Sequence, residues 1–405
     1  MRIQRHRYPP SARRHRQQGC LPFSFLLGLM TAGLLFSWGW ISQTLWPPGE
    51  QNAAADLSGA QAALASGDLT GAIEKARAVY EGDNSRSDAL ILLIRTLIYQ
   101  SYDDYDTAGN REFALQLTTR ALRASPNDPV LLGLHAFAQQ TNAQSLEAYN
   151  TAKRVRMLRP QDILAQIVTG MAYGGIGSYD RALNEQEAVA ARLANPNALD
   201  DDPTAAGWQL DSLRALAIAY SDLGHYQDAL KTVDRAIRLN PRLNVLYFER
   251  ALYAMQIGDS SKATDSYFEI LGRSPNNVKA RLRLCETASV SRDRDMALRY
   301  CQEVTERAPT WSEGWYKLGR EHFLAGDFTA AQGALNRCST LQVTQGVPVT
   351  ERRFECWYLQ GQAAEINGDC EALLSTYHEF QAMTAQQSIS QTWVYPPEGP
   401  PGCVQ

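Results

Sequence analysis

Acidic residues are absent from the first 49 positions, and charged residues of either sign are absent from residues 17–49. Cysteine is just as uneven, because none of the seven cysteines lies between Cys20 and Cys285. No C-x-x-C pair occurs, which argues against a structural zinc site. The chain also lacks the G-x-S-x-G nucleophile turn and the G-x-x-x-x-G-K-[ST] phosphate loop. The sequence therefore predicts no catalytic residue, no metal and no cofactor.

The composition is that of a folded chain with one apolar run. Of the 405 residues, 44% are apolar and 20% are charged, which is ordinary for a globular protein. A mean hydropathy of −0.34 excludes a membrane protein with many spans. The exception is Leu21 to Ile41, which is long enough to cross a hydrocarbon core of about 30 Å as a helix.

The residues around this run predict its orientation. Trp38, Trp40 and Trp46 follow or end it, where indole rings favour the boundary between lipid and water. Only arginines are charged before it, so the positive-inside rule places residues 1–20 in the cytoplasm. We expect a single-pass membrane protein whose N-terminus is cytoplasmic and whose remaining residues are extracytoplasmic. A signal peptide cleaved near Ala55, which would release a secreted protein, is the alternative.

The charge is divided in the same way. Six arginines supply every charge before Glu50, and since the whole chain carries −4, residues 50–405 carry −10. A surface of this sign argues against nucleic acid as a partner.

A 34-residue period organises the sequence after the apolar run. Pro126 and Pro160 are one period apart, and Pro241, Pro275 and Pro309 continue the same step. An alanine precedes each of these prolines by twelve residues, and extension of the step adds three more. The alanines are Ala72, Ala114, Ala148, Ala182, Ala229, Ala263, Ala297 and Ala331.

Residues 312–345 show the motif most fully, with Trp315, Leu318 and Gly319 in the first half and Gly326 between the halves. This pattern resembles the tetratricopeptide repeat (TPR), a helical hairpin that stacks only on its neighbours. The resemblance implies an all-α fold. We expect an α-α superhelical solenoid of about nine TPR-like helical hairpins with a concave groove, preceded by the single transmembrane helix.

Departures from the 34-residue step predict the domain boundaries. The segments are a basic cytoplasmic tail at 1–20, a transmembrane anchor at 21–46, a juxtamembrane linker at 47–52, TPR-like repeats 1–4 at 53–196, an acidic insertion at 197–209, repeats 5–8 at 210–345, a linker at 346–353, a C-terminal hairpin at 354–387 and a proline-rich tail at 388–405. Extra residues also fall at 101–109. We expect both acidic insertions to be solvated loops, since neither follows the EF-hand spacing for calcium.

The resemblance also implies a binding surface, because the first helix of each TPR hairpin lines the groove. The candidate partner-binding residues are Arg214, Phe248, Leu252, Met255, Lys279, Leu282, Glu286, Tyr316, Arg320 and Phe323. Aromatic, Met and Arg side chains mixed with a few charges are typical of binding hot spots. The alternative is that several of them pack against the next repeat or the linker.

Six cysteines follow the apolar run, and an exported compartment would favour their pairing. They are Cys285, Cys301, Cys338, Cys356, Cys370 and Cys403. Six cysteines allow fifteen connectivities. In the TPR register Cys285 and Cys301 face each other across one hairpin, so the resemblance implies a disulfide between them. We expect two further disulfides, one joining Cys338 to Cys356 across the linker and one joining Cys370 to Cys403 in the tail. Six buried thiols are the alternative.

These features together predict a non-catalytic scaffold or adaptor on the extracytoplasmic face of a membrane, such as a bacterial envelope. The predicted partner is a protein or peptide in the groove. The alternative role is an accessory or sensor subunit of an envelope complex, including carbohydrate-processing machinery. The sequence leaves the identity of the partner and the oligomeric state open.

Overall fold

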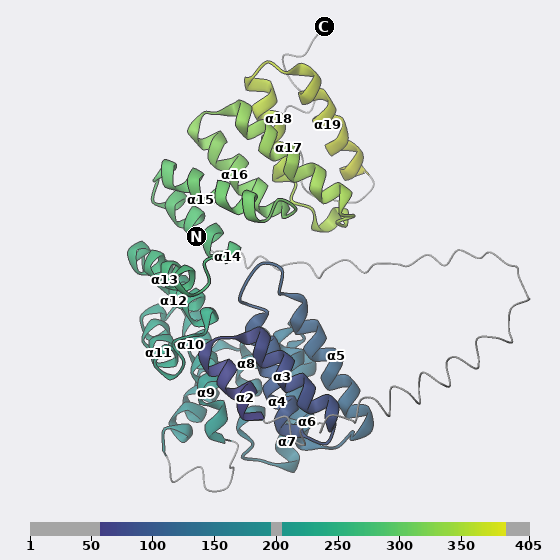
Figure 1. The fold of residues 1–405 in the computed structure, drawn as a ribbon, viewed down its shortest axis with the longest axis vertical. Helices are drawn as coiled ribbons and strands as arrows, with labels where there is room; N and C mark the ends of the chain where they lie inside the picture. The colour runs from purple at the N-terminus through teal and green to yellow at the C-terminus, as the bar shows by residue number, and fades with distance from the viewer. Residues whose placement is uncertain (1–56, 196–204, 386–405) are drawn as a thin grey trace, which may run out of the picture. The chain divides into compact units, whose positions relative to one another are not determined.

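The structure is a computed structural model that describes residues 57–195 and 205–385 (Figure 1). The described residues form eighteen α-helices and two short 3₁₀ helices, and they contain no strand. The α-helices are α2 (Leu57–Ser66), α3 (Leu69–Gly82), α4 (Ser87–Gln100), α5 (Gly109–Ala124), α6 (Pro129–Thr141), α7 (Ser145–Leu158), α8 (Ile163–Gly175), α9 (Tyr179–Leu193), α10 (Gln209–Asp222), α11 (Tyr226–Leu239), α12 (Asn244–Gln256), α13 (Ser260–Arg273), α14 (Val278–Val290), α15 (Arg294–Arg307), α16 (Ser312–Ala325), α17 (Phe328–Thr344), α18 (Glu355–Ile366) and α19 (Cys370–Ala385). The 3₁₀ helices are η2 (Ala205–Trp208) and η3 (Val349–Glu351).

Taken in order, the described helices follow the paired arrangement that the repeat predicts, and α2 packs against α3. Each even-numbered helix from α6 to α18 packs against the next odd-numbered one. First helices of neighbouring pairs also pack together, as α14 does with α16 and α16 with α18. In Figure 1 these helices follow one another along the chain as the colour passes from blue to yellow. The prediction of an all-α helical repeat solenoid is confirmed for the described residues.

The chain divides into two compact units in sequence, with the division between Thr96 and Leu97. The first holds α2, α3 and most of α4, and the second holds the helices from α5 onward. All ten candidate groove residues belong to the second unit.

Small residues keep the two helices of a pair close, as the repeat pattern requires. All eight alanines of the 34-residue series are buried, with at most 2% of their surface exposed. On α16, a Cβ atom added to Gly319 would lie 2.6 Å from Cγ of Leu335 on α17. Any side chain at residue 319 would therefore push the two helices apart.

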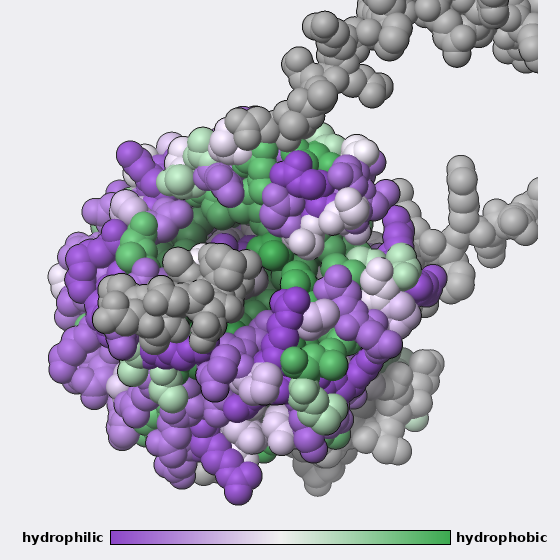
Figure 2. All heavy atoms as spheres, turned by 90° about the horizontal axis from the view of Figure 1, so that it is seen from below, coloured by the Kyte–Doolittle hydropathy of each residue, from purple (hydrophilic) through white to green (hydrophobic). Residues whose placement is uncertain are grey.

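The ends of the helices are also set by local sequence. Asp259 and Asp327 accept hydrogen bonds from backbone N–H groups in the first turns of α13 and α17. Gly177, between α8 and α9, has a φ of +86°, a conformation that glycine adopts without a steric penalty. On the face drawn in Figure 2, hydrophobic residues are visible among the hydrophilic ones that cover most of the described surface.

The predicted anchor at 21–46, the linker at 47–52 and the tail at 388–405 lie outside the described residues. Among the helices of 57–195 and 205–385, none is long and apolar enough to cross a bilayer.

Candidate functional site

The ten candidate groove residues lie on α10, α12, α14 and α16, the first helices of four consecutive pairs. Three of them are not open to solvent. Leu282 is 1% exposed, and Arg214 and Tyr316 are each 8% exposed. At these three positions the structure shows packing within the chain, which is the alternative that the sequence left open.

Tyr316 is covered by the linker between α17 and α18. The Arg353 guanidinium lies 4.4 Å from the centre of the Tyr316 ring, and its Nη2 atom lies 2.7 Å from a carboxylate oxygen of Glu313. Packing against the linker, which the sequence left open as an alternative, describes this residue.

Arg214 is engaged from two directions inside the second unit. Its Nη2 atom donates to a carboxylate oxygen of Glu249 at 2.6 Å. The rings of Tyr99 and Tyr102 lie 5.4 and 5.5 Å from its guanidinium carbon. Burial by itself would lower the pKa of Arg214, but Glu249 and the tyrosines outweigh it and raise the pKa. Arg214 thus stays charged and contributes to the interior of the second unit.

The acidic insertion after α4 is not a solvated loop, and this prediction is also corrected. Asp103 and Asp104 are partly buried, and burial raises the pKa of both carboxyl groups. Lys279, one of the candidate groove residues, donates from Nζ to the carbonyl oxygen of Tyr102. Burial, with a smaller contribution from Arg283, lowers the pKa of Lys279 to about 8. Part of the predicted groove is therefore filled by the chain itself.

A second acidic insertion precedes α10. Its residues 197–204 lie outside the described part of the chain. Where the structure resumes, Trp208 is buried, and its ring meets that of Phe137 edge-on at 6.1 Å.

The open part of the candidate surface lies on α12. Phe248, Leu252 and Met255 are spaced four and three residues apart, which places them on one face of the helix. Leu252 is 51% exposed, and Phe248 and Met255 are partly exposed. The Lys279 ammonium group lies 4.4 Å from the centre of the Phe248 ring. This α12 face presents apolar side chains beside a cation.

Charged candidates on α14 and α16 pair with their neighbours. Glu286 accepts from Arg283 Nη1 at 2.5 Å and lies 2.6 Å from Lys317 Nζ. Burial alone would raise the pKa of Glu286, but Arg283 and Lys317 outweigh it and lower the pKa to about 2. Glu286 is therefore ionised throughout the neutral range.

The remaining candidates, Arg320 and Phe323, are partly exposed on α16. Arg320 donates to the fully buried carboxylate of Glu321 at 2.8 Å and to the hydroxyl of Ser289 at 3.2 Å. The ring of Phe323 meets that of Phe328 edge-on at 5.2 Å. A partner of α16 would therefore meet side chains that are already held in place.

We expect Glu286→Gln to lower the free energy of unfolding by about 2 kcal/mol at pH 7, since it removes a carboxylate that two cations bind. The folded-state pKa of about 2 lies below the ordinary value of 4.5, so this stabilisation is complete above pH 4.5. It is lost as the pH falls from 4.5 toward 2. Urea unfolding of both chains at pH 7 and pH 3 measures the difference, which should be smaller at pH 3.

Glu306→Gln, on the exposed side of α15, is the matched control and should cost less than about 0.5 kcal/mol. An effect of Glu286→Gln that does not change with pH would contradict the assignment of its stabilisation to the ionised carboxylate.

Two of the expected disulfides are present. Cys285 is bonded to Cys301, joining α14 to α15 with the Cα atoms 5.3 Å apart. Cys338 is bonded to Cys356, joining α17 to α18 with the Cα atoms 6.0 Å apart. Cys403 lies outside the described residues, so its pairing with Cys370 stays a prediction.

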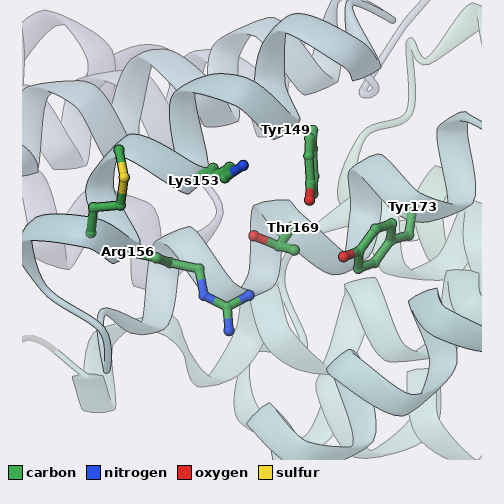
Figure 3. Close-up of a pocket in the computed structure, with 6 residues that line it drawn as sticks. Tyr149, Lys153, Arg156, Thr169 and Tyr173 are labelled. Atoms are coloured by element: carbon green, nitrogen blue, oxygen red, sulfur yellow. The ribbon is translucent and has the colours of Figure 1, made fainter.

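Sequence reasoning missed one concave feature, between α7 and α8. A cavity of about 270 Å³ is lined by Tyr149, Lys153, Arg156, Met157, Thr169 and Tyr173. In Figure 3, Tyr149 and Tyr173 lie on one side of it, Arg156 on the other, and Thr169 between them. Arg156 also donates to Glu185 at 2.8 Å. The four-and-three spacing of residues 149, 153 and 156 places them on one helix face, a signal that the sequence did contain.

Within residues 57–195 and 205–385, no three His, Cys, Asp or Glu side chains come together as a metal site. The described chemistry of this surface consists of hydrogen bonds, ion pairs and apolar contacts.

Comparison with known proteins supports the TPR resemblance. A family model described as tetratricopeptide repeat matches residues 214–278, which run from α10 to the start of α14. No curated protein sequence matches the chain.

Solved structures also match the chain. The crystal structure of the APC/C hetero-tetramer Cut9–Hcn1 matches 79% of this chain with a TM-score of 0.50 and 15% identity. The match covers 57% of that chain, so this protein spans little more than half of that neighbour's length. The crystal structure of MamA matches 43% of this chain and 94% of its own, with 20% identity and a TM-score of 0.34. A tetratricopeptide repeat protein from Parabacteroides merdae matches 65% of this chain and 95% of its own, with 16% identity and a TM-score of 0.39. At an identity of 15%, the first of these supports the fold alone: a helical repeat of the TPR class.

Proposed function

We propose that this protein is a membrane-anchored scaffold that binds a protein or peptide on the extracytoplasmic side. The observation that carries the binding role is the open apolar face of α12. Leu252 keeps 51% of its surface exposed although it lies at a position that TPR proteins use for partners. Burial of such a side chain by a partner is favourable by about 25 cal/mol per Å² of apolar surface.

The membrane part of the proposal rests on the sequence. The run from Leu21 to Ile41 is flanked by arginines on one side only, which is the pattern of a single-pass anchor with a cytoplasmic N-terminus. The two disulfides of the last three hairpins favour an oxidising compartment for the rest of the chain. Since cysteines stay reduced in most cytosolic proteins, these bonds and the charge pattern support the same orientation.

Site-specific crosslinking tests the binding surface. A photo-crosslinking residue in place of Leu252 in the native membrane should give a discrete protein adduct, and Met255→Glu in the same chain should abolish it. Val290 is the matched control, because it is equally apolar, 70% exposed and located at the end of α14. No adduct from residue 252, or the same adducts from residues 252 and 290, would overturn the α12 face as the binding surface.

Thiol labelling of intact cells tests the orientation separately. With Ser291→Cys, an exposed position on the solenoid, a membrane-impermeant maleimide should label the chain before lysis. With Gln17→Cys, in the basic tail, the same reagent should label it only after lysis. The reverse pattern would place the solenoid in the cytoplasm.

A further inference from the structure

The 101–108 loop, which connects α4 to α5, reaches the start of α14, more than 170 residues further along the chain. The side-chain amide of Asn277 donates to the carbonyl oxygen of Asp103 at 2.8 Å. The backbone N–H groups of Val278 and Lys279 donate to the two carboxylate oxygens of Asp104 at 3.1 and 2.9 Å. One loop segment therefore satisfies several donors of α14 at once.

These contacts have the form of ligand binding at a helix terminus. The first N–H groups of an α-helix have no partner within the helix, and the helix dipole favours an anion there. The side-chain oxygen of Asn277 accepts a hydrogen bond from the backbone N–H of Ala280 at 2.7 Å. The Asp104 carboxylate accepts hydrogen bonds from the N–H groups of Val278 and Lys279, which Asn277 does not bind. A remote carboxylate thus completes the cap of α14.

An aromatic contact lies next to the carboxylate. The ring of Tyr105 stacks on that of Trp311, with centroids 4.6 Å apart and planes 25° apart. Both rings pack against an apolar cluster of Val278, Leu282, Val304 and Ala308. We call this surface, with Asn277, Lys279 and Trp311, the α14 seat.

The seat overlaps part of the predicted partner surface. Lys279 and Leu282 belong to the positions that the TPR register assigns to partner binding, and both are covered by the chain's own loop. The loop contacts the seat through a carboxylate, backbone carbonyl groups and an aromatic ring on the residue after the carboxylate. An extended peptide of another chain could supply the same groups. The occupant therefore indicates the chemistry that the seat selects.

Seating the loop also has a cost, because it removes charged groups from water. Burial raises the pKa of Asp103 and Asp104 and lowers that of Lys279 to about 8. Desolvation thus opposes the same contacts that the hydrogen bonds favour. A segment that supplies equivalent hydrogen bonds can exchange with the loop.

We propose that the α14 seat recognises an extended partner segment in which a carboxylate residue is followed by an aromatic one, and that the 101–108 loop is its internal competitor. This inference rests on the proposed binding function and names the kind of partner. It requires no covalent step, since hydrogen bonds and ring stacking are exchanged for equivalent contacts.

The test uses the full-length chain in detergent and a fluorescent peptide with the loop's own sequence, SYDDYDTAG. Asp104→Ala with Tyr105→Ala removes both groups that fill the seat. We expect this variant to bind the peptide at least tenfold more tightly than the unmodified chain, as measured by fluorescence anisotropy. Asp106→Ala is the matched control, because it removes a charge from an exposed position of the same loop and should leave peptide binding unchanged.

We call the chain with Asp104→Ala and Tyr105→Ala the vacated variant. Two changes should reverse its gain in peptide affinity. A peptide in which asparagine replaces the second aspartate should bind the vacated variant at least tenfold more weakly. Trp311→Ala, added to that variant, should have a similar effect. Equal binding by the vacated and the unmodified chain, or no binding by a vacated chain that keeps its helical content, would overturn the proposal.

Hydrogen exchange of the unmodified chain provides a second test that does not depend on the folding of a variant. Saturating peptide should speed exchange of the backbone amides of residues 101–108, since the loop is displaced. Unchanged exchange there at saturation would overturn the proposal. The crosslinking at residue 252 does not involve the seat, so adducts there together with a failed peptide test would reject the seat and leave the binding function standing.

Discussion

Replacement of Trp357 by alanine should cost about 3–5 kcal/mol of stability in the C-terminal hairpins, because it removes the largest side chain that is fully buried among the described residues. Trp357 lies on α18 in a cluster with Phe354, Phe380 and Met383. The ring of Phe354 also meets that of Phe380 edge-on at 5.6 Å. These contacts join α18 to α19, which ends the described solenoid, so no later described repeat can compensate for their loss.

Hydrogen exchange followed by mass spectrometry, together with urea unfolding, measures this effect. Because repeats contact only their neighbours, exchange should increase in α18 and α19 and stay unchanged in α10 and α11. Trp357→Phe is the matched control. The indole Nε1 of Trp357 is buried and has no acceptor among the described residues, so phenylalanine removes that polar group and keeps most of the ring. We expect it to cost less than half as much as alanine, and equal losses would contradict this assignment.

The repeat was predictable from sequence because its packing rule is local. A residue such as Gly319 must be small when Leu335 packs directly against it, and a fixed period places that constraint at the same position in every hairpin. The pairing of Cys285 with Cys301 followed from the same register, since both lie in one hairpin. Contacts within a hairpin, or between adjacent ones, repeat with the period.

The state of the groove was not predictable in this way. Lys279 and Leu282 occupy positions that the register calls open, yet the 101–108 loop covers them from a distance of more than 170 residues in sequence. Insertions interrupt the 34-residue period, so the period does not predict which residues an inserted loop contacts. Tyr316 illustrates the same limit, because the linker residue that covers it, Arg353, also lies outside the repeat.

The charge pattern identified the 101–108 loop as acidic but did not predict which residues it contacts. The Asp103–Asp104 pair is acidic and flanked by tyrosines, and its composition alone favours a solvated loop. Whether such a loop is solvated or packed depends on whether N–H groups without a helical partner, and a cation, lie within reach of its carboxylates. Asn277 and Lys279 supply them, and no sequence rule joins residues so far apart.

Removal of the Cys338–Cys356 disulfide should also have a large effect. The bond closes a segment with a sequence separation of 18 residues, and loops of this length are expected to stabilise the folded state by about 3 kcal/mol. We expect Cys338→Ala with Cys356→Ala to lower the free energy of unfolding by about this amount in oxidising buffer. Urea unfolding in the presence and absence of dithiothreitol measures it.

The other disulfide provides the matched comparison. Cys285→Ala with Cys301→Ala opens a link between α14 and α15 within one hairpin, whereas the Cys338–Cys356 bond joins α17 to α18 of adjacent hairpins across the 346–353 linker. Both helix pairs also pack directly, so the comparison isolates the position of each bond. The Cys338–Cys356 variant should therefore increase hydrogen exchange in α18 and α19, and the Cys285–Cys301 variant in α14 and α15. Dithiothreitol should destabilise the unmodified chain more than either double variant, because each variant already lacks one of the disulfides that the reductant breaks. If dithiothreitol leaves the unmodified chain unchanged, the four thiols are reduced in the purified protein, and the argument for an oxidising compartment fails with them.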